Sequence, residues 1–355
     1  MLRHFQTWKL TDFDYAAPKK LVAKYPAEPR HEARMMVVDR AAGTVTHRAV
    51  ADLPEYFGKG DVLVVNDTEV FSARLRGKKE RSGGQVEVFL VRELRADQHL
   101  WDALVEPARK VRVGNKVVFA DGLEAEILDS TTTRGRTLRF CFDGPPEELY
   151  ARIEAIGETP IPPYLRRPAE PEDRERFQSV FARQRGAVTA PAACLHFTDE
   201  LVAAIRAKGA AVCPVTLHAG LGTFQPVECE DLNKHHTDAE HFAVPEATAV
   251  AVSEALADPG RTVTCASATT VRALESSRSV GRAVRAGEGW TDAFIRPPHT
   301  CEVADRLLTN FHRPCSTPLM LTSAFCGHDL LMFAYEEAIR EEYRLFAYGD
   351  AMLIV

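Results

Sequence analysis

The sequence predicts an α/β domain that is built from both ends of the chain and is interrupted by a smaller β domain. Two changes of pattern along the 355 residues indicate this fold class. From about residue 61 to 142, short apolar or alternating runs are separated by Gly-rich turns, which is typical of a small β-barrel or sandwich. After residue 198, helical and strand-like segments alternate, which is typical of parallel strands with helices between them. We place the inserted domain at residues 67–146 and the main domain at 1–66 and 147–355.

The first half of the chain reads mainly as strands. Near the N-terminus, MMVVD (35–39) and TVTHR (44–48) predict a hairpin. Six further strand-like runs are VLVVN (62–66), QVEVFLVREL (85–94), LWDALV (100–105), KVVFA (116–120), LEAEIL (123–128) and TLRFCF (137–142). A helical pattern follows at 147–157 and leads into a proline-rich segment. The strand-like runs after residue 66 are therefore expected to belong to the inserted domain.

In the second half of the chain, helical and strand-like hydrophobic patterns alternate. The expected elements are helices at 198–208, 246–256 and 268–277, and strands at 211–218 and 262–266. Two further segments, 235–242 and 278–289, read as an exposed loop and a mobile basic loop.

The segment 306–327 places a polar turn inside an apolar neighbourhood. Thr309, Asn310 and His312 follow an apolar pair and precede the apolar stretch 319–325, and Ser316 or Thr317 can cap a helix with Pro318 at its first position. Buried polar groups require partners, so such a cluster is either a structural network or a ligand site. We favour the ligand site.

Composition excludes several classes of protein. A net charge of −6 and a pI near 6.1 argue against binding nucleic acid through bulk charge, so a nucleic-acid partner requires a local basic patch. The basic runs 74–81, 107–112 and 164–168 are candidates, although each can equally be a solvated face. No apolar run is long enough to span a membrane, and the N-terminus lacks a signal peptide's apolar core. Eight scattered cysteines without a CxxC pair fit a cytoplasmic protein without disulfides or a zinc site.

Two histidines precede expected turns. His196 lies before Thr198, which can cap a helix, and the alternative is a polar residue in a capped loop. His218 ends an expected strand and is followed by Gly220 and Gly222, where α/β domains often bind ligands. An ordinary tight turn is the alternative there.

Two more polar clusters follow expected strands. Residues 235–242 hold three histidines and two carboxylates, but no second ligand cluster completes a metal site, so we expect no metal and assign Glu240 as a base or a hydroxyl-binding carboxylate. Thr269, Thr270 and Arg272 begin the helix at 268–277. The alternative for them is a plain capped helix with an Arg272–Glu275 ion pair.

A series of short motifs covers nearly the whole chain: DFDY (12–15), YPAEPR (25–30), NDT-x-V (66–70), ARL (73–75), GG-x-VEV (83–88), PARK (107–110), IPPY-x-RRP (161–168), APAACLHFT (190–198), TLHAGLGTFQPV (216–227), VRALES (271–276), GWTD (289–292), LLTNFH (307–312), SAF (323–325) and YGDAMLI (348–354). In these motifs and in their order, the chain resembles the S-adenosylmethionine:tRNA ribosyltransferase-isomerase (QueA) family of queuosine biosynthesis. The resemblance implies an α/β barrel-like main domain with an inserted small β-barrel. It also implies transfer and isomerisation of the ribosyl part of S-adenosylmethionine onto 7-aminomethyl-7-deazaguanine in a tRNA anticodon. The products are epoxyqueuosine-tRNA, adenine and methionine.

The resemblance also implies roles for the polar residues. S-adenosylmethionine is consumed as a co-substrate, and tRNA is the partner; we expect no further cofactor. The catalytic candidates are His196, His218, His312 and Glu240. The substrate-binding candidates are Asn310, Thr269, Thr270, Arg272, Gly220, Gly222 and Asp350, and the tRNA-binding candidates are Arg109, Lys110, Arg166 and Arg167.

The chain departs from the family pattern in the same turns. Cys194 and Ser267 stand where the family usually has glycine, Asp238 where it has histidine, and Cys315 where it has arginine. Other departures are Ala192, Arg296, His299, Arg313 and Pro318. They leave two alternatives open: a paralogue that uses a different substrate, and a catalytically silent tRNA-binding protein.

Overall fold

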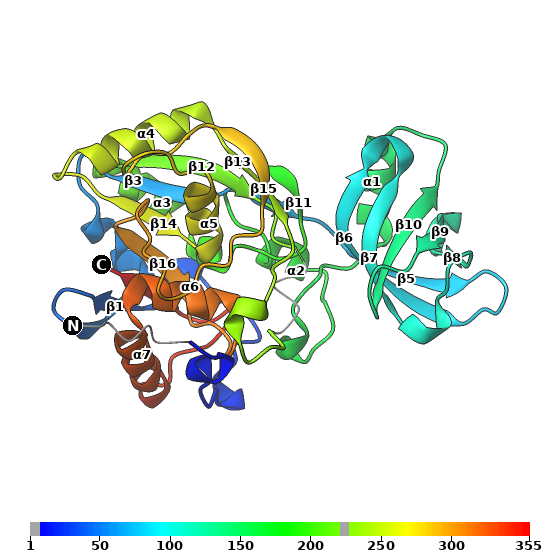
Figure 1. Ribbon diagram of the computed structural model, residues 1–355, viewed down its shortest axis with the longest axis horizontal. Helices are drawn as coiled ribbons and strands as arrows, with labels where there is room; N and C mark the ends of the chain where they lie inside the picture. Colours follow the sequence, from blue (N-terminus) through cyan, green and yellow to red (C-terminus); the bar gives the residue numbers. More distant parts are fainter. Residues whose placement is uncertain (1–7, 221–226) are drawn as a thin grey trace. The chain divides into compact units, whose positions relative to one another are not determined.

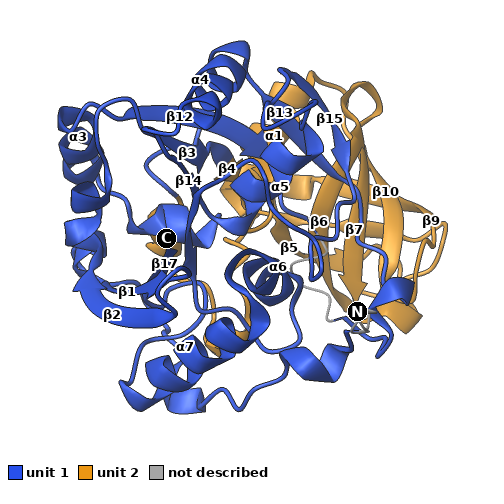
Figure 2. Cartoon of the chain, turned by 60° about the vertical axis from the view of Figure 1, so that its left-hand side comes forward, with its two compact units in different colours: residues 1–68, 179–184, 190–355 blue, residues 69–178, 185–189 orange. Residues whose placement is uncertain are grey.

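The computed structural model describes residues 8–220 and 227–355, which divide into two compact units (Figure 2). Unit 1 comprises residues 1–68, 179–184 and 190–355, and unit 2 comprises 69–178 and 185–189. Unit 2 is therefore longer than the insertion expected at 67–146. The helix after residue 146 belongs to it because Glu154 on that helix accepts hydrogen bonds from the Ser72 backbone N–H, at 3.1 and 3.3 Å.

Unit 1 is built on one nine-stranded mixed sheet. In spatial order, its strands are β15 (Gly287–Thr291), β13 (Glu240–Val244), β12 (Ala211–Leu217), β3 (Val62–Asn66), β14 (Val263–Ala266), β16 (Arg306–Asn310), β17 (Ala351–Ile354), β1 (Arg34–Asp39) and β2 (Thr44–Ala49). The four strands β12, β3, β14 and β16 are mutually parallel, whereas β13, β15 and β17 run antiparallel to their inner neighbours. The carboxyl ends of the four parallel strands thus share one edge of the sheet.

Helices cover both faces of this sheet. Leu63 and Val65 of β3 pack with Leu201 and Ile205 of α3 (Asp199–Ala207), while the alternate residues of β3 are buried on the opposite face. The helices α4 (Glu246–Ala257) and α5 (Ala268–Ser276) contact β3, and α5 also contacts α6 (Thr317–Cys326), which packs on α7 (His328–Arg340). Figure 1 shows α4, α5, α6 and α7 in the part coloured yellow to red, and β3 in blue.

Unit 2 contains a closed six-stranded antiparallel barrel. The strand order is β10 (Gly135–Cys141), β7 (Leu100–Glu106), β6 (Gln85–Arg95), β5 (Arg74–Lys79), β8 (Lys116–Val118) and β9 (Glu124–Asp129). Trp101, Ala103 and Val105 alternate with more exposed neighbours along β7, the pattern of a strand with one face in a core. Closure leaves the barrel without an unpaired edge.

Unit 2 also holds α1 (Pro146–Ile156) and α2 (Asp173–Arg176). The strands β4 (Thr68–Val70) and β11 (Gln184–Ala187) form a separate two-stranded sheet.

The predicted fold class is confirmed, with corrections in two loops. The α/β domain, the N-terminal hairpin, the inserted barrel and the helices at 199–207, 246–257 and 268–276 all form. The expected exposed loop at 235–242 is wrong in its second half, because Glu240 begins β13. Similarly, the expected loop at 278–289 runs into β15. Both are outer strands that gain backbone hydrogen bonds from a neighbouring strand, which a local sequence pattern does not reveal.

None of the helices within 8–220 and 227–355 is long and apolar enough to cross a membrane.

Candidate functional site

Polar residues follow each of the parallel strands at their shared carboxyl edge. Asn66 ends β3, His218 follows β12, Ser267 follows β14 and Asn310 ends β16. In α/β sheets, ligands bind in the crevice outside this edge. Four strands therefore bring together polar residues that lie up to about 240 positions apart in the sequence.

A pocket opens at this edge between α5, α6 and the segment after β15. Its walls combine apolar and polar side chains: Ala219, Thr237, Asp238, Glu240, Ala268, Thr269, Arg272, Ala293, Phe294, Ile295, Thr317, Pro318 and Leu321. Three sequence-predicted residues, Glu240, Thr269 and Arg272, therefore line one cavity. Thr317 and Pro318 place the first turn of α6 in its wall.

An ion pair between Glu240 and Arg272 lies in the pocket wall. Glu240 Oε2 accepts from an Arg272 guanidinium nitrogen, and Glu240 Oε1 accepts from the Gly220 backbone N–H at 2.7 Å. Arg272 Nε donates to the Ala293 carbonyl at 3.2 Å. Arg272 thus pairs with Glu240 and not with Glu275, so the plain helix-surface ion pair is wrong. Gly222 lies outside the described residues.

Asn66 is a central residue of the site that the sequence candidates omitted. Its Nδ2 donates to the Leu217 carbonyl at 3.0 Å and to Thr269 Oγ1 at 2.9 Å, and its Oδ1 accepts from the Leu217 and Thr68 N–H groups. It therefore ties the ends of β3 and β12 to the start of α5. A polar side chain directly after the apolar run VLVV was the signal that could have found it.

Thr270, by contrast, points away from the pocket. Its side chain is fully buried and donates to the Ser267 carbonyl at 2.7 Å. The structure gives it a local role at the start of α5, which does not fit the substrate contact expected for it.

His218 lies beside the pocket, next to the lining residue Ala219. Its Nδ1 is 2.8 Å from Thr68 Oγ1, and its ring stacks on His241 with centroids 5.8 Å apart. Burial, with His241 adding to it, lowers the pKa of His218 to about 4. The ring is therefore neutral at pH 7, although the same shift makes it a weaker base than an ordinary histidine.

His312 is held by hydrogen bonds from its ring and its backbone and is partly exposed. Its Nε2 is 2.7 Å from Thr309 Oγ1, its backbone N–H donates to the Tyr335 hydroxyl at 2.7 Å, and its carbonyl accepts from the Tyr15 hydroxyl at 2.5 Å. Burial lowers the pKa of His312 to about 4. These contacts favour a structural role for His312 near the carboxyl edge of the sheet.

A second group of candidates, which we call the C-terminal cluster, consists of Asn310, His196, Asp350 and Arg344. Asn310 Nδ2 donates to the Phe346 carbonyl at 3.1 Å. His196 Nε2 and Asn310 Oδ1 are buried and find no hydrogen-bond partner among the described residues. Burial lowers the pKa of His196 to about 4, opposed by the charge of Asp350. The cluster adjoins a small hollow lined by His196, Leu195, Ala347 and their neighbours.

Asp350 is occupied by its own fold. Its carboxylate accepts from Arg344 Nε and NH2 at 3.0 Å, from the Arg344 N–H at 2.8 Å and from the Arg34 N–H at 3.3 Å. Only 2% of the residue is exposed. The arginine and backbone donors give Asp350 a structural role, and the substrate contact expected for it stays a prediction.

The tRNA-binding candidates of unit 2 differ from one another. Arg109 and Lys110 are exposed on the short 3-10 turn Ala108–Lys110, which the buried Arg136 fixes by donating to the carbonyls of Ala108 and Val111 at 2.7 and 2.9 Å. A rigid turn thus presents two cations to solvent.

The arginines at 166 and 167 have different environments. Arg166 is exposed, whereas Arg167 forms a bidentate pair with the fully buried Asp173, at 2.5 and 2.7 Å. Its side chain is only 8% exposed. Arg167 therefore stabilises unit 2 and does not fit the expected phosphate contact.

The departures from the family pattern have distinct structural settings. Ser267 has φ +92° and ψ 156°, a conformation that glycine adopts freely and serine rarely does. Cys315 also has a positive φ of 55°. Cys194 is fully buried under Ala266, and burial raises the pKa of its thiol to about 12. Asp238 lines the pocket.

Comparison with known proteins extends this picture. A family model described as "Queuosine biosynthesis protein" matches residues 10–354. The chain is 51% identical to the S-adenosylmethionine:tRNA ribosyltransferase-isomerase of Flavobacterium psychrophilum, over 98% of this chain and 100% of that protein. It is 50% identical to the protein of the same name from Chloroherpeton thalassium, over 98% and 99%.

A solved structure gives the same result. The crystal structure of S-adenosylmethionine tRNA ribosyltransferase from Thermotoga maritima aligns over 97% of this chain and 100% of that chain, with a TM-score of 0.54 and 32% identity. Match length and identity together leave one conclusion: the chain belongs to the queuosine biosynthesis protein family.

Proposed function

We propose that this chain transfers and isomerises the ribosyl moiety of S-adenosylmethionine onto 7-aminomethyl-7-deazaguanine in a tRNA anticodon, with release of adenine and methionine. Relatives that bear this name are about 50% identical over nearly the full chain. S-adenosylmethionine is a co-substrate in this proposal, and we expect no further cofactor for the reaction. Because tRNA is the acceptor, we expect the protein in the cytoplasm.

The observation that carries the proposal is the Glu240–Arg272 pair in a pocket with apolar walls. S-adenosylmethionine combines an aromatic base, ribose hydroxyls, a sulfonium, an ammonium and a carboxylate. Phe294, Ile295 and Leu321 offer apolar surface for the base. Each Glu240 oxygen keeps a second lone pair, so the carboxylate can still accept a hydroxyl or ammonium donor.

The carboxylate of the methionine part needs a positive partner. Arg272 and the first turn of α6 at Thr317 both face the pocket. The free N–H groups of a helix start and a guanidinium are suitable donors for a carboxylate. Thr269, held by Asn66, is positioned to bind a ribose hydroxyl.

The reaction requires a base for the ribose 5′ proton, which the adjacent sulfonium makes acidic. Three histidines are candidates, and we assign this role to His218 because it adjoins the pocket and its Nδ1 is fixed by Thr68. Asn310 and His196 carry buried unpaired atoms that a substrate group can satisfy. We assign His312 a structural role near the carboxyl edge of the same sheet.

The proposal is tested by incubating the protein with S-adenosylmethionine and tRNA that carries the deazaguanine precursor. We expect adenine, methionine and modified nucleoside in equal amounts. Adenine without a tRNA product would indicate a paralogue with another substrate. Salt-sensitive tRNA binding without any turnover would indicate a silent binding protein.

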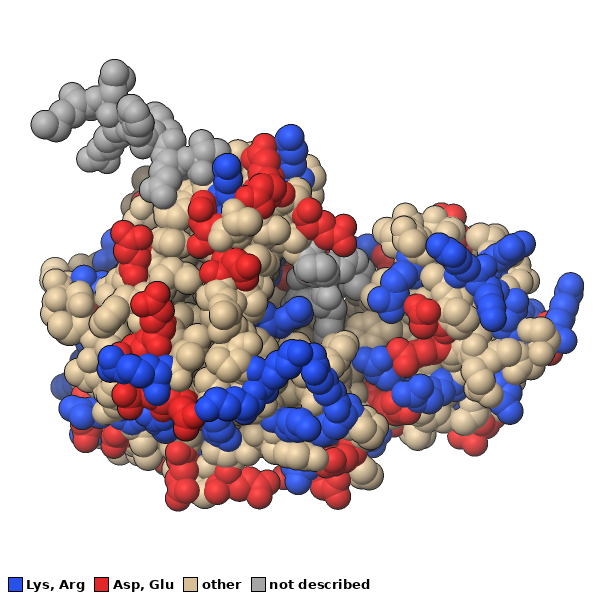
Figure 3. All heavy atoms as spheres, turned by 90° about the horizontal axis from the view of Figure 1, so that it is seen from below, with Lys and Arg blue, Asp and Glu red and all other residues tan. Residues whose placement is uncertain are grey.

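Contact with tRNA through unit 2 is a separate part of the proposal. Figure 3 shows Lys and Arg side chains mixed with carboxylates over one face, so a phosphate contact must come from particular exposed cations. Reversing Arg109 and Lys110 to glutamate should weaken tRNA binding at least about tenfold and reduce its salt dependence, while leaving S-adenosylmethionine binding unchanged.

The matched control is Arg95→Glu, an exposed arginine of the same unit that pairs with Asp97. Equal losses of tRNA and S-adenosylmethionine binding in the double reversal, or the same tRNA loss in the control, would reject this surface.

A further inference from the structure

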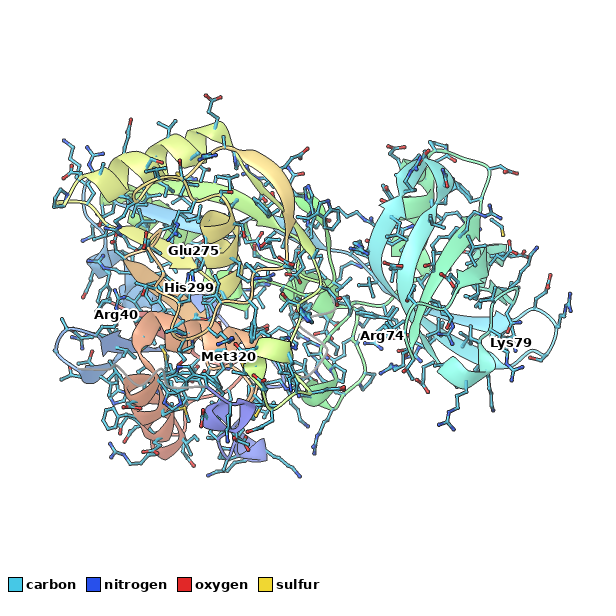
Figure 4. The ribbon with its side chains drawn as sticks, viewed as in Figure 1. Arg40, Arg74, Lys79, Glu275, His299 and Met320 are labelled. Atoms are coloured by element: carbon cyan, nitrogen blue, oxygen red, sulfur yellow. The ribbon has the colours of Figure 1, made fainter. Side chains whose placement is uncertain are left out.

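Three potential metal ligands meet at the far end of α5 from the pocket residue Thr269. Glu275 lies in the last turn of α5, and His299 and Cys301 lie in the segment between β15 and β16. Figure 4 shows Glu275 and His299 next to each other, on the helix and on this segment. Neither residue has a role in the proposed reaction.

The ligand atoms are close enough to share one ion. The Glu275 oxygen, His299 nitrogen and Cys301 sulfur all lie within 4.8 Å of one another, and His299 Nε2 is 3.4 Å from Glu275 Oε2. Neighbouring ligands around a tetrahedral zinc ion are about 3.5 Å apart, given metal–ligand bonds of about 2.0–2.3 Å. Closing the remaining gap requires side-chain shifts of about an ångström.

The cluster is also oriented as a metal site requires. Glu275 Oε1 accepts from the backbone N–H groups of Glu302 and Val303, at 2.8 and 3.3 Å, which leaves Oε2 directed at His299. Hydrogen bonds of this kind fix the orientation of the side chains that bind the metal. Within the described part of the chain, the recorded ion pair of Glu275 is with His299.

The nearby cations are engaged elsewhere. Arg278 pairs with Glu302 at 3.0 Å, and Arg282 pairs with Asp305 at 2.5 Å. Only 5% of the Glu275 side chain is exposed. A buried carboxylate without an arginine or lysine partner favours a bound cation.

We propose that Glu275, His299 and Cys301 bind a zinc-type divalent ion, with a solvent water as the fourth ligand. One third of the His299 side chain is exposed, which gives the ion and the water access. The ion would tie α5, which carries Thr269 and Arg272, to the segment that supplies Ala293, Phe294 and Ile295 to the pocket wall. Its role is structural and goes beyond the proposed function.

The proposal departs from the expectation, drawn from the sequence, that the chain holds no zinc site. The three ligands have no motif spacing, since 24 residues separate Glu275 from His299, and the segment between them has no regular pattern. Only the packing of the 292–305 segment against α5 brings them together. The sequence prediction was based on the histidines at 235–242 and did not include His299.

The test is titration of the purified, chelator-treated full-length chain with Co²⁺ and with Zn²⁺. We expect one Co²⁺ per chain with a thiolate-to-cobalt absorption band, displaced by Zn²⁺. Cys301→Ser should abolish the band, and His299→Ala should weaken binding at least about tenfold. Cys141→Ser, which removes an exposed thiol of unit 2, is the matched control and should leave the titration unchanged.

Thermal unfolding supplies the second readout. Zn²⁺ should raise the Tm of the wild-type chain and not that of His299→Ala, whose half-exposed side chain can be removed without loss of the fold, as its metal-free Tm will verify. Absence of stoichiometric Co²⁺ binding would overturn the proposal. So would a cobalt band that persists in Cys301→Ser or disappears in Cys141→Ser. Because none of these readouts uses S-adenosylmethionine or tRNA, their failure is distinct from failure of the proposed function.

Discussion

The pocket and the C-terminal cluster lie on the same edge of one sheet, but they present their polar groups in opposite ways. In the pocket, Glu240 and Arg272 are paired with each other and still line an open cavity. In the cluster, the Asp350 carboxylate is engaged by donors from Arg344 and Arg34. Both pairs join a carboxylate to an arginine. The comparison shows that an ion pair alone does not identify a ligand site. The pair must also line a cavity that a ligand can enter.

The same contrast separates the histidines. Both histidines have one hydrogen-bonded ring nitrogen and a hydrogen-bonded backbone N–H, but His218 directly precedes the pocket residue Ala219. Their pKa values are both lowered to about 4 by burial. A shifted pKa is therefore shared by a candidate base and a packing residue, and only position tells them apart.

The largest expected effects come from replacing these two histidines separately. His218→Ala should lower the rate of adenine release by about 10²–10⁴-fold, the usual contribution of a general base, with little change in the free energy of unfolding. His312→Ala should lower the free energy of unfolding by about 1–2 kcal/mol, because it leaves the buried Thr309 without its hydrogen-bond partner.

Single-turnover adenine release and urea unfolding measure the two quantities. If His312→Ala lowered the rate of adenine release without a loss of stability, while His218→Ala left that rate unchanged, the roles assigned to the two histidines would be wrong.

A smaller effect follows from pH. Since burial lowers the pKa of His312 from 6.5 to about 4, the unfolded chain binds a proton below about pH 6.5 that the folded chain refuses until about pH 4. This histidine's contribution to stability is therefore complete above pH 6.5 and is lost as the pH falls through 4. The slope is at most about 1.4 kcal/mol per pH unit.

His312→Gln should reduce the slope of unfolding free energy against pH between 4 and 6.5. His236→Gln, at an exposed position, serves as the control and should not. An unchanged slope in His312→Gln would show that the ring is charged when folded.

The smallest effect concerns Ser267, whose backbone conformation suits glycine. Both Ser267→Gly and Ser267→Ala lose the 2.5 Å hydrogen bond to Thr269, but only the glycine variant also removes the cost of a Cβ at φ +92°. The glycine variant should therefore be more stable than the alanine variant by about 1–2 kcal/mol. Equal free energies of unfolding in guanidinium for the glycine and alanine variants would mean that the backbone at this turn adjusts and removes the cost of the Cβ.

Much of this arrangement is predictable from the sequence because local patterns specify it. Thr198 accepts from the Leu201 N–H at the start of α3, as its position before an acidic turn predicts. The apolar runs of β3, β12 and β14 likewise predict buried parallel strands, and parallel strands predict that His218 and Asn310 share an edge. Glu240, Thr269 and Arg272 line one pocket as a result.

The rest depends on contacts between distant segments. Nothing in the local sequence shows that Arg272 pairs with Glu240 across 32 residues, that Asp350 is enclosed by Arg344, or that Arg167 pairs inward with Asp173. Residues 240–244 become a strand only because β12 offers an edge. The domain boundary moves for a similar reason, since α1 is tied to the barrel side by Glu154.

The most direct test of the central claim is the same isosteric change in both regions, with S-adenosylmethionine affinity measured by calorimetry and stability by urea unfolding. Glu240→Gln should weaken S-adenosylmethionine binding at least about tenfold, since the pocket wall loses the charged partner of Arg272. Asp350→Asn should instead lower the free energy of unfolding by about 2–3 kcal/mol, because Arg344 loses its buried partner, while the folded protein binds S-adenosylmethionine as the wild type does. Loss of affinity in Asp350→Asn with unchanged binding in Glu240→Gln would contradict the account.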